Sequence, residues 1–353
     1  MQDYKKKLSD LIELTIAQGA SDLHLGAGIQ PTTRVSGVMT PIVSEPALAD
    51  EDMLGILDAM LTPELKKRFM DTQEVDFSYA YGQVARFRGN GYFQRGRIGI
   101  ALRLIPRTIR SVAELHLPQM IEHANREQGF FLVVGPVGQG KTTTLAALIE
   151  KVNQERTEHI ITIEDPIEYL FENKRSLIDQ REVRIDTADF QVALQSVFRQ
   201  DVDVVMIGEM RTPETIATAV TAAETGHLVL STLHTNNAVQ TIDRIIDVFP
   251  AGQQNQVRIQ LASSLAGIFS QRLIPRISGG LIPAYELLLN NTAVANLIRE
   301  ERTHEIQNMI ETGAAEGMID MNRCLAELVR AGEITIESAY SRSVSPKTLE
   351  RLL

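Results

Sequence analysis

The sequence holds a single cysteine, Cys324, among 353 residues, and it contains no long apolar run. One thiol can form neither an intrachain disulfide nor a four-cysteine zinc site, so a disulfide framework is excluded and a reducing compartment is expected. No uninterrupted apolar stretch approaches the ~20 residues of a membrane-spanning helix, and no signal-type apolar core follows Lys5-Lys6-Lys7. We therefore expect a soluble, cytoplasmic protein that can dock on a membrane protein.

A surplus of positive charge is also missing. Asp and Glu number 45 against 35 Lys and Arg, which leaves a formal net charge of −10. Nucleic-acid binders need clustered Lys and Arg to neutralise phosphates, and no basic, aromatic-rich groove is evident here. No nucleic-acid partner is expected, although a RecA-like nucleic-acid motor stays open as an alternative that stimulation by single-stranded DNA would support.

The apolar patterns divide the chain into two regions. Residues 1–115 predict a small α+β domain, with an amphipathic helix near its start and a β-hairpin formed by residues 86–95 and 98–105. Residues 116–353 predict a second domain, with a mostly parallel, helix-covered sheet in 120–281 and a mainly helical region in 282–353. Its predicted strands are 130–134, 159–163, 202–207 and 228–233. The expected fold class is therefore α/β with an α+β domain before it.

A phosphate-binding pattern, G-x-x-x-x-G-K-[ST], lies between the predicted strand 130–134 and a predicted helix 142–153. Backbone N–H groups of such a loop point at phosphate oxygens, and the following helix N-terminus favours negative charge. Lys141 would reach the β- and γ-phosphates of ATP, and Thr142 would hold Mg²⁺. The alternative is a glycine-rich turn without a ligand. The pattern consists of Gly135, Pro136, Val137, Gly138, Gln139, Gly140, Lys141 and Thr142, and Thr143 is added to the predicted nucleotide-binding set.

Acidic residues follow two of the predicted strands. Glu164, Asp165 and Glu168 come after strand 159–163, and Glu209 comes after strand 202–207. Parallel sheets bind ligands at the carboxyl ends of their strands, so one of the first three can orient or deprotonate the attacking water. Glu209 takes the place of the acid that holds Mg²⁺ through water. A solvated acidic turn is the alternative interpretation.

Histidines and arginines supply further candidates. His227 and His234 bracket strand 228–233, and their separation makes a shared metal unexpected. His234, at the carboxyl end, can reach the phosphates as a sensor. Arginines on the predicted hairpin suit a bridge to phosphate across a domain or subunit interface, and surface ion pairs are the alternative. These arginines are Arg86, Arg88, Arg95 and Arg103.

Taken together, the motifs resemble the hexameric secretion and pilus ATPases, and within them the twitching-motility, or PilT-like pilus-retraction, ATPases. The resemblance covers essentially the whole chain, because Ser21-Asp22-Leu23-His24 is similar to the N-terminal signature of that family. The other matching stretches are 135–144, 161–169, 180–183, 208–211, 222–228, 231–236, 241–244 and 247–250.

The resemblance implies a PAS-like N-terminal domain joined to a RecA-like ATPase domain, with six copies in a ring and ATP between the two domains. Glu168 is then the catalytic acid, Glu209 the Mg²⁺-coordinating acid, and His227 and His234 the histidine box. Arg88 and Arg103 are the matches to the family's arginine sensors, and Arg95 is a weaker one. Domain rotation driven by ATP binding, hydrolysis and release would turn the inner-membrane platform protein at the pilus base and dislodge pilins from the fibre. The motor would then lie at the inner face of the cell membrane.

Departures from the family pattern keep alternatives open. Ala295, in Ala293 to Glu300, replaces the first Arg of the retraction signature, which leaves the direction of pilus movement resting on resemblance. The alternatives are an accessory retraction ATPase, another secretion-type pilus ATPase, or a nucleotide-gated scaffold. A paralogous pilus ATPase is a possible partner. Assembly ATPases generally carry an additional N-terminal domain and a four-cysteine zinc site, and with one cysteine and no extra domain expected here, that type is not expected.

Overall fold

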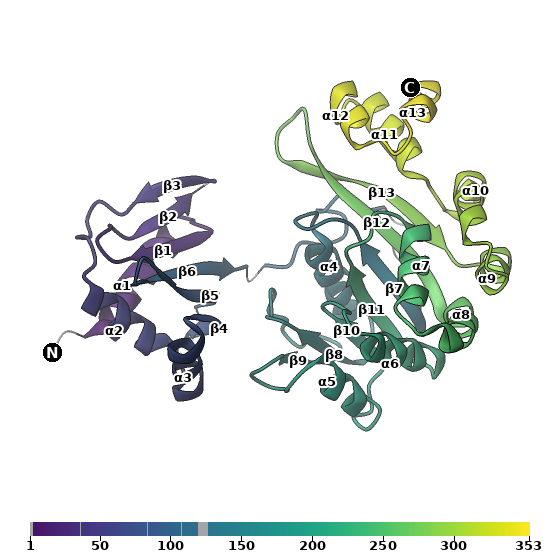
Figure 1. The fold of residues 1–353 in the computed structure, drawn as a ribbon. Coiled ribbons are helices and arrows are strands. Elements are labelled where there is room, and N and C mark those ends of the chain that lie inside the picture. The colour runs from purple at the N-terminus through teal and green to yellow at the C-terminus, as the bar shows by residue number, and fades with distance from the viewer. Residues whose placement is uncertain (1–2, 36, 83, 107, 119–125) are drawn as a thin grey trace. The chain divides into compact units, whose positions relative to one another are not determined.

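The computed structural model describes residues 3–35, 37–82, 84–106, 108–118 and 126–353, and Figure 1 shows its ribbon. The chain forms two compact units. The first comprises Met1–Thr108 together with Pro166–Leu170, and the second comprises Ile109–Asp165 and Phe171–Leu353. The predicted domain limits stay predictions, and the expected start of the nucleotide-binding core, residue 120, lies outside the described residues.

The first unit is an antiparallel sheet with helices packed against it. Its six strands follow the order β3-β2-β1-β6-β5-β4 (Figure 1). Buried Leu8, Leu11 and Ile12 pack in one core with strand residues such as Leu23 and Phe87. The apolar spacing of the first helix therefore buries one face on the sheet. The elements are α1 Tyr4–Ala17, β1 Asp22–Gly26, β2 Thr32–Val35, β3 Val38–Pro41, α2 Asp50–Met60, α3 Pro63–Thr72, β4 Glu74–Tyr81, β5 Ala85–Gln94 and β6 Arg97–Ile105.

The predicted hairpin of the first unit is strands β5 and β6. Gln94 pairs with Arg97 at its tip, and the two residues between them, Arg95 and Gly96, have φ angles of 50° and 76°. Two consecutive positive φ values are typical of the two-residue turns whose twist matches that of the strands. The hairpin is thus closed by a tight turn, and its register places Arg88 opposite Arg103.

The second unit is built on a seven-stranded sheet in the order β13-β12-β7-β11-β10-β8-β9. All neighbours from β12 to β9 are parallel, as the alternation of strands and helices predicts. The central strands are buried along their whole length, which fits a sheet covered by helices on both faces. Its elements up to β11 are β7 Gly129–Val134, α4 Lys141–Glu155, β8 His159–Glu164, β9 Leu177–Glu182, α5 Phe190–Val197, β10 Val204–Ile207, α6 Pro213–Glu224 and β11 Leu228–Leu233.

Residues 282–353 are mainly helical, as the fold-class prediction states, but their first eight residues form part of a strand. These belong to β13, Leu281–Leu289, which pairs antiparallel with β12, Leu265–Pro275. A continuous apolar run such as Leu-Leu-Leu is compatible with a buried helix and with a buried strand. In this chain the pairing with β12 makes it a strand. Helices follow β13. The remaining helices are α7 Ala238–Asp247, α8 Ala251–Ser264, α9 Thr292–Arg299, α10 Ile306–Thr312, α11 Met321–Arg330, α12 Ile336–Arg342 and α13 Pro346–Leu352, with 3-10 turns at Thr303–Glu305 and Gly313–Glu316.

The register of the parallel strands brings their carboxyl ends to one edge of the sheet. Val134 pairs with Leu233, and Ile207 pairs with both Ser231 and Ile163. Segments that leave these strands therefore start close together, as in other parallel α/β sheets.

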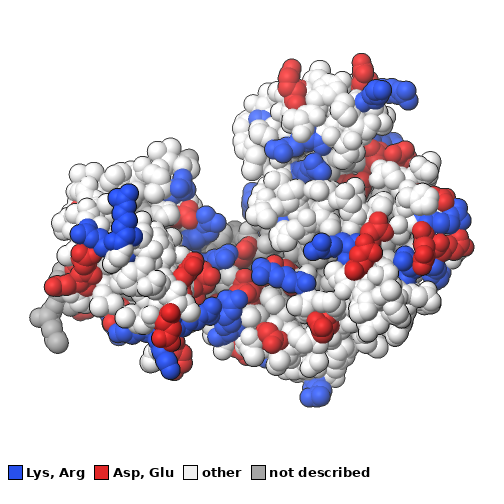
Figure 2. Space-filling view, in the orientation of Figure 1, with Lys and Arg blue, Asp and Glu red and all other residues white. Residues whose placement is uncertain are grey.

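Two further properties concern surface charge and the possibility of a membrane-spanning helix. Lys and Arg are interspersed with Asp and Glu on the face shown in Figure 2, and no helix among the described residues is long and apolar enough to cross a bilayer.

Candidate functional site

The predicted phosphate loop connects the buried strand β7 to helix α4. Gly135 has φ 149°, and a Cβ added there would lie 2.4 Å from the backbone oxygen of Gln271. Gly140 is the N-cap of α4 and has φ 77°. Gly135 therefore excludes a side chain unless the backbone moves, and the positive φ of Gly140 favours glycine, which explains the glycines of the pattern. The first N–H groups of α4 have no intrahelical acceptor, so the loop ends in a site suited to an anion.

Lys141 is the first residue of α4, and its side chain folds back along the loop. Its Nζ donates hydrogen bonds to the carbonyl oxygens of Gly135 and Pro136, at 2.9 Å each, and lies 3.2 Å from Nδ1 of His234. The residue is only 7% exposed. A buried ammonium group is tolerated when its donors have partners, and these contacts supply them. The loop therefore holds a positive charge at the helix N-terminus.

Gln271 on β12 ties the loop to the sheet, and sequence analysis did not identify it. Its Oε1 accepts a hydrogen bond from the Thr144 hydroxyl at 2.6 Å, and its Nε2 donates to the Gln139 backbone oxygen at 2.7 Å. The Gln139 side chain in turn accepts from the Leu273 N–H at 2.7 Å. Gln271 is 132 residues from Gln139, and no local pattern marks it.

His234 follows β11 and lies between Lys141 and Glu209. Burial lowers the pKa of His234 most, and the charge of Lys141 lowers it further. The ring is therefore neutral at neutral pH, so Nδ1 accepts from Lys141 and Nε2 carries the proton. Nε2 lies 3.9 Å from Oε2 of Glu209. The other carboxylate oxygen of Glu209 pairs with the Arg211 guanidinium at 2.6 Å.

The predicted strand-end acids occupy different environments. Glu164 is 3% exposed and accepts hydrogen bonds from Thr162 at 2.7 Å and Gln180 at 3.1 Å. Asp165 pairs with Arg184 at 3.1 Å. Two of the three carboxylates thus have structural partners in the second unit. Glu168 belongs to the segment 166–170, which groups with the first unit.

Glu168 shares a pocket of the first unit with the two predicted arginine sensors. This cavity measures about 310 Å³, and Arg88 and Arg103 line it together with Glu168. Arg88 and Arg103 are cross-strand neighbours on β5 and β6. The arrangement places two guanidinium groups and one carboxylate around a single cavity. The other lining residues are Ser21, Leu104, Ile105, Pro106, Ile167 and Tyr169.

His227 lies at the opposite end of β11 from His234. Its Nδ1 is 3.0 Å from the Ala222 oxygen, and its ring packs edge-on against Phe198 with centroids 5.6 Å apart. A six-residue strand separates the two histidines by roughly 20 Å. Within one chain His227 is therefore remote from the phosphate loop, and its predicted nucleotide contact stays a prediction.

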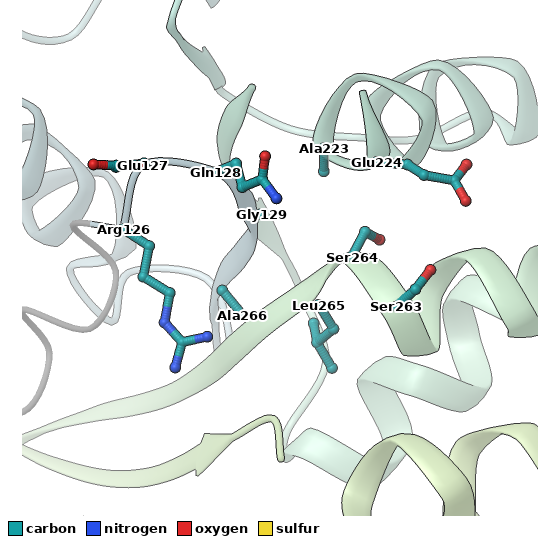
Figure 3. A pocket seen from close by; sticks show the side chains of 10 residues that line it. All are labelled: Arg126, Glu127, Gln128, Gly129, Ala223, Glu224, Ser263, Ser264, Leu265 and Ala266. Atoms are coloured by element: carbon teal, nitrogen blue, oxygen red, sulfur yellow. The ribbon is translucent and has the colours of Figure 1, made fainter. Parts of the chain in front are cut away.

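A larger cavity of about 680 Å³ lies at that same amino-terminal edge of the sheet, remote from the phosphate loop. It is lined by residues 126–129, 223–224 and 263–266 (Figure 3). Figure 3 shows the carboxylates of Glu127 and Glu224 pointing to opposite sides, so they do not converge on one ion. Lys141, His234 and Glu209 lie near one another at the opposite, carboxyl edge of the sheet.

The residues near the loop fit Mg²⁺ as an accompanying ion. Among the described residues, no group of three or more His, Cys, Asp and Glu could hold a metal by itself. Mg²⁺ prefers oxygen ligands and commonly takes one or two from protein, with nucleotide phosphates and water supplying the rest. The Thr142 hydroxyl and the Glu209 carboxylate offer such oxygens.

Comparisons with known proteins agree with this geometry. The model of the family "Type II/IV secretion system protein" matches residues 5–337. The chain is 41% identical over 341 residues to the type IV pilus retractation ATPase PilT of Pseudomonas aeruginosa, covering 96% of this chain and 99% of that protein. It is 44% identical over 322 residues to a twitching motility protein of Neisseria gonorrhoeae, covering 90% and 86%.

A solved structure gives the same result in three dimensions. The crystal structure of the pilus retraction motor PilT with bound ADP superposes with a TM-score of 0.91 at 45% identity, covering 97% of this chain and 98% of that one. Both units, the antiparallel sheet and the mixed sheet with its C-terminal helices, fall within that overlap. The chain therefore belongs to the type II/IV secretion system protein family, as a nucleotide-binding ATPase of its PilT-like group of type IV pilus retraction and twitching-motility ATPases.

Proposed function

We propose that this chain hydrolyses MgATP to retract a type IV pilus and so drives twitching motility. The observation that carries the proposal is the meeting of Lys141, His234 and Glu209 at the carboxyl edge of the sheet. Similarity to a retraction ATPase over nearly the whole length supports the same activity. The energy source is the γ-phosphate bond, and the output is removal of pilins from the fibre.

The proposed chemistry assigns one role to each group. Backbone N–H groups of the loop and Lys141 bind the phosphates, and Thr142 and Glu209 are the residues that would hold Mg²⁺. When bound there, Mg²⁺ would supply positive charge that neutralises the phosphate oxygens. Glu168 orients and deprotonates the attacking water, and His234 senses the phosphate. Arg88 and Arg103 stabilise charge on the transferred group, and Thr143 and His227 complete the nucleotide contacts.

Force generation follows from assembly. We propose a homo-hexameric ring on the inner, cytoplasmic face of the cell membrane, with the inner-membrane platform protein as partner. Arginines carried by the first unit then make hydrolysis depend on domain position, because charge on the transferred phosphate is stabilised only when they reach it. No nucleic acid takes part.

A second candidate, an accessory retraction ATPase working beside a paralogue, is favoured by one observation. Ala295, 7% exposed on α9, stands where the retraction signature has Arg. Ala295 lines a cavity with Arg126 and Leu265 at the amino-terminal edge of the sheet, away from the phosphate loop. The missing guanidinium therefore concerns coupling to the pilus and leaves nucleotide chemistry unchanged.

Deletion of the gene in its native host tests the proposal, with surface pili counted and twitching scored. Abundant pili without twitching support retraction. Bald cells would assign extension instead, and unchanged cells would leave only the accessory role. Complementation with Lys141→Ala should not restore twitching, whereas Lys151→Ala should, since Lys151 pairs with Glu155 further along α4. ATP hydrolysis by the purified ring separates a motor from a nucleotide-gated scaffold.

A further inference from the structure

A row of charged residues crosses the sheet of the first unit. Strand register pairs Arg34 with Asp22, Asp22 with Arg103, and Arg103 with Arg88. Directly opposed residues on neighbouring strands point to the same face. In this row the arginines on β2, β6 and β5 point to the same face as Asp22 on β1, and Asp22 lies between Arg34 and Arg103.

Asp22 is the buried member of this row, at 7% exposed. Its Oδ1 accepts a hydrogen bond from Nε of Arg103 at 2.9 Å, and its Oδ2 accepts one from the Ser21 hydroxyl at 2.7 Å. Nε of Arg34 lies farther away, 3.9 Å from Oδ2. Burial acts to raise the pKa of Asp22, but the hydrogen bonds from Ser21 and Arg103 outweigh it and the pKa lies below its ordinary value. Asp22 is therefore a carboxylate at neutral pH.

The contact with Asp22 engages Arg103 through only one part of its guanidinium. The Arg103 side chain is 71% exposed, and Nε is the atom bonded to Asp22. A guanidinium held at Nε keeps its two terminal nitrogens as donors in a fixed plane, suited to phosphate oxygens. The same side chain lines the 310 Å³ cavity that contains Arg88 and Glu168. Asp22 itself does not line that cavity.

We propose that Asp22 is a positioning residue for ATP hydrolysis, holding Arg103 so that its terminal nitrogens face the transferring phosphate. The inference rests on the proposed function, in which Arg103 stabilises charge on that phosphate. An exposed arginine samples many rotamers, and a buried carboxylate at Nε restricts them before the nucleotide arrives. The competing interpretation is purely structural, with Asp22 neutralising the arginines of the sheet.

A double-mutant cycle on the full-length ring distinguishes these roles. Asp22→Asn should lower turnover roughly ten-fold, since misplacement of a catalytic group costs up to about 10²-fold, and it should leave the Kd for ATP unchanged. In the Arg103→Ala background the same substitution should cause no further loss. Asp58→Asn is the matched control, because it removes the same charge from an ion pair with Lys66, 2.6 Å long, on the same unit. It should leave turnover intact.

Each outcome decides the inference. Full turnover in Asp22→Asn, or an equal loss with and without Arg103, overturns it. Full turnover in Arg103→Ala refutes the proposed role of Arg103 itself, so the two failures are distinguishable. Ring size and the thermal unfolding midpoint report folding. If Asp22→Asn does not fold, Asp22→Glu keeps the charge and displaces it by one methylene, and the same coupling to Arg103→Ala is measured. Arg34→Gln should spare turnover, since its contact with Asp22 is long.

Discussion

Nζ of Lys141 lies 3.2 Å from Nδ1 of His234, although the two residues are 93 positions apart. They meet because β7 and β11 are adjacent parallel strands that end in register at Val134 and Leu233. The contact joins the phosphate loop to the segment that leads into α7. Any movement of Lys141 towards a phosphate therefore alters the environment of His234.

Lys141→Ala should abolish turnover and weaken ATP binding by at least ~10-fold. Charge-assisted hydrogen bonds are worth about 1.5–3 kcal/mol each, and loss of one corresponds to about ten-fold or more in affinity. Titration with a fluorescent ATP analogue measures the effect. Lys151→Ala on the same helix is the control and should bind normally. An unchanged Kd in Lys141→Ala would contradict the assignment of the loop.

His234 should produce an acid limb in the pH profile of turnover. Burial and the charge of Lys141 hold its pKa below the ordinary 6.5, so activity should persist at pH 6.5 and fall only below it. Because the unfolded chain binds this proton more readily, folded stability should also decline as pH falls below 6.5.

His234→Asn tests this limb, because Asn keeps an acceptor near Nδ1 and does not titrate. The variant should lack the His-dependent part of the acid limb in kcat measured from pH 5 to 8. His304→Asn is the control, since the His304 side chain is 76% exposed and its Nε2 lies 3.7 Å from Oε1 of Glu305, far from the phosphate loop in the fold. A limb unchanged in His234→Asn would assign it to another group.

Glu168→Gln should reduce turnover by at least ~10²-fold while ATP binding is retained. Positioned acid–base groups contribute about 10²–10⁴-fold, and the amide cannot accept the proton of the attacking water. Steady-state phosphate release and nucleotide titration measure the two effects. Glu172→Gln, an exposed carboxylate in the same connecting segment, should behave as the native protein. Unchanged turnover in Glu168→Gln would refute the water-activating role.

Gly135→Ala should damage the site more than Gly138→Ala does. Both positions have positive φ, which L residues rarely adopt. At Gly135 the new Cβ would also lie 2.4 Å from the Gln271 oxygen, whereas at Gly138 no atom lies within 4 Å. The thermal midpoint and the Kd for ATP should therefore change more for Gly135→Ala. Equal effects of the two substitutions would contradict this prediction, because they would show that the clash between the new Cβ and the Gln271 oxygen costs no stability.

Much of the fold could be predicted from local pattern. The alternation of apolar strands with helices predicts the parallel sheet, and the hairpin of β5 and β6 follows from its turn and its strand alternation. The antiparallel edge strand β13 could not be predicted, because its apolar run is compatible with a buried helix or a buried strand. Only its pairing with β12 makes it a strand. Sequence analysis missed Gln271 because its contacts with the phosphate loop form only when β12 pairs with β7.

The sequence by itself determined the chemistry of the phosphate loop. Glycines at 135 and 140, Lys141 and Thr142 need only a strand before them and a helix after them, and both are local properties. Tertiary structure alone decided what surrounds that loop. Lys141 meets His234, Gln139 meets Gln271, and Arg103 meets Asp22 through strand pairing between segments distant in sequence. Burial and hydrogen-bond geometry, which set the charge state of His234 and the orientation of Arg103, exist only once those strands are paired.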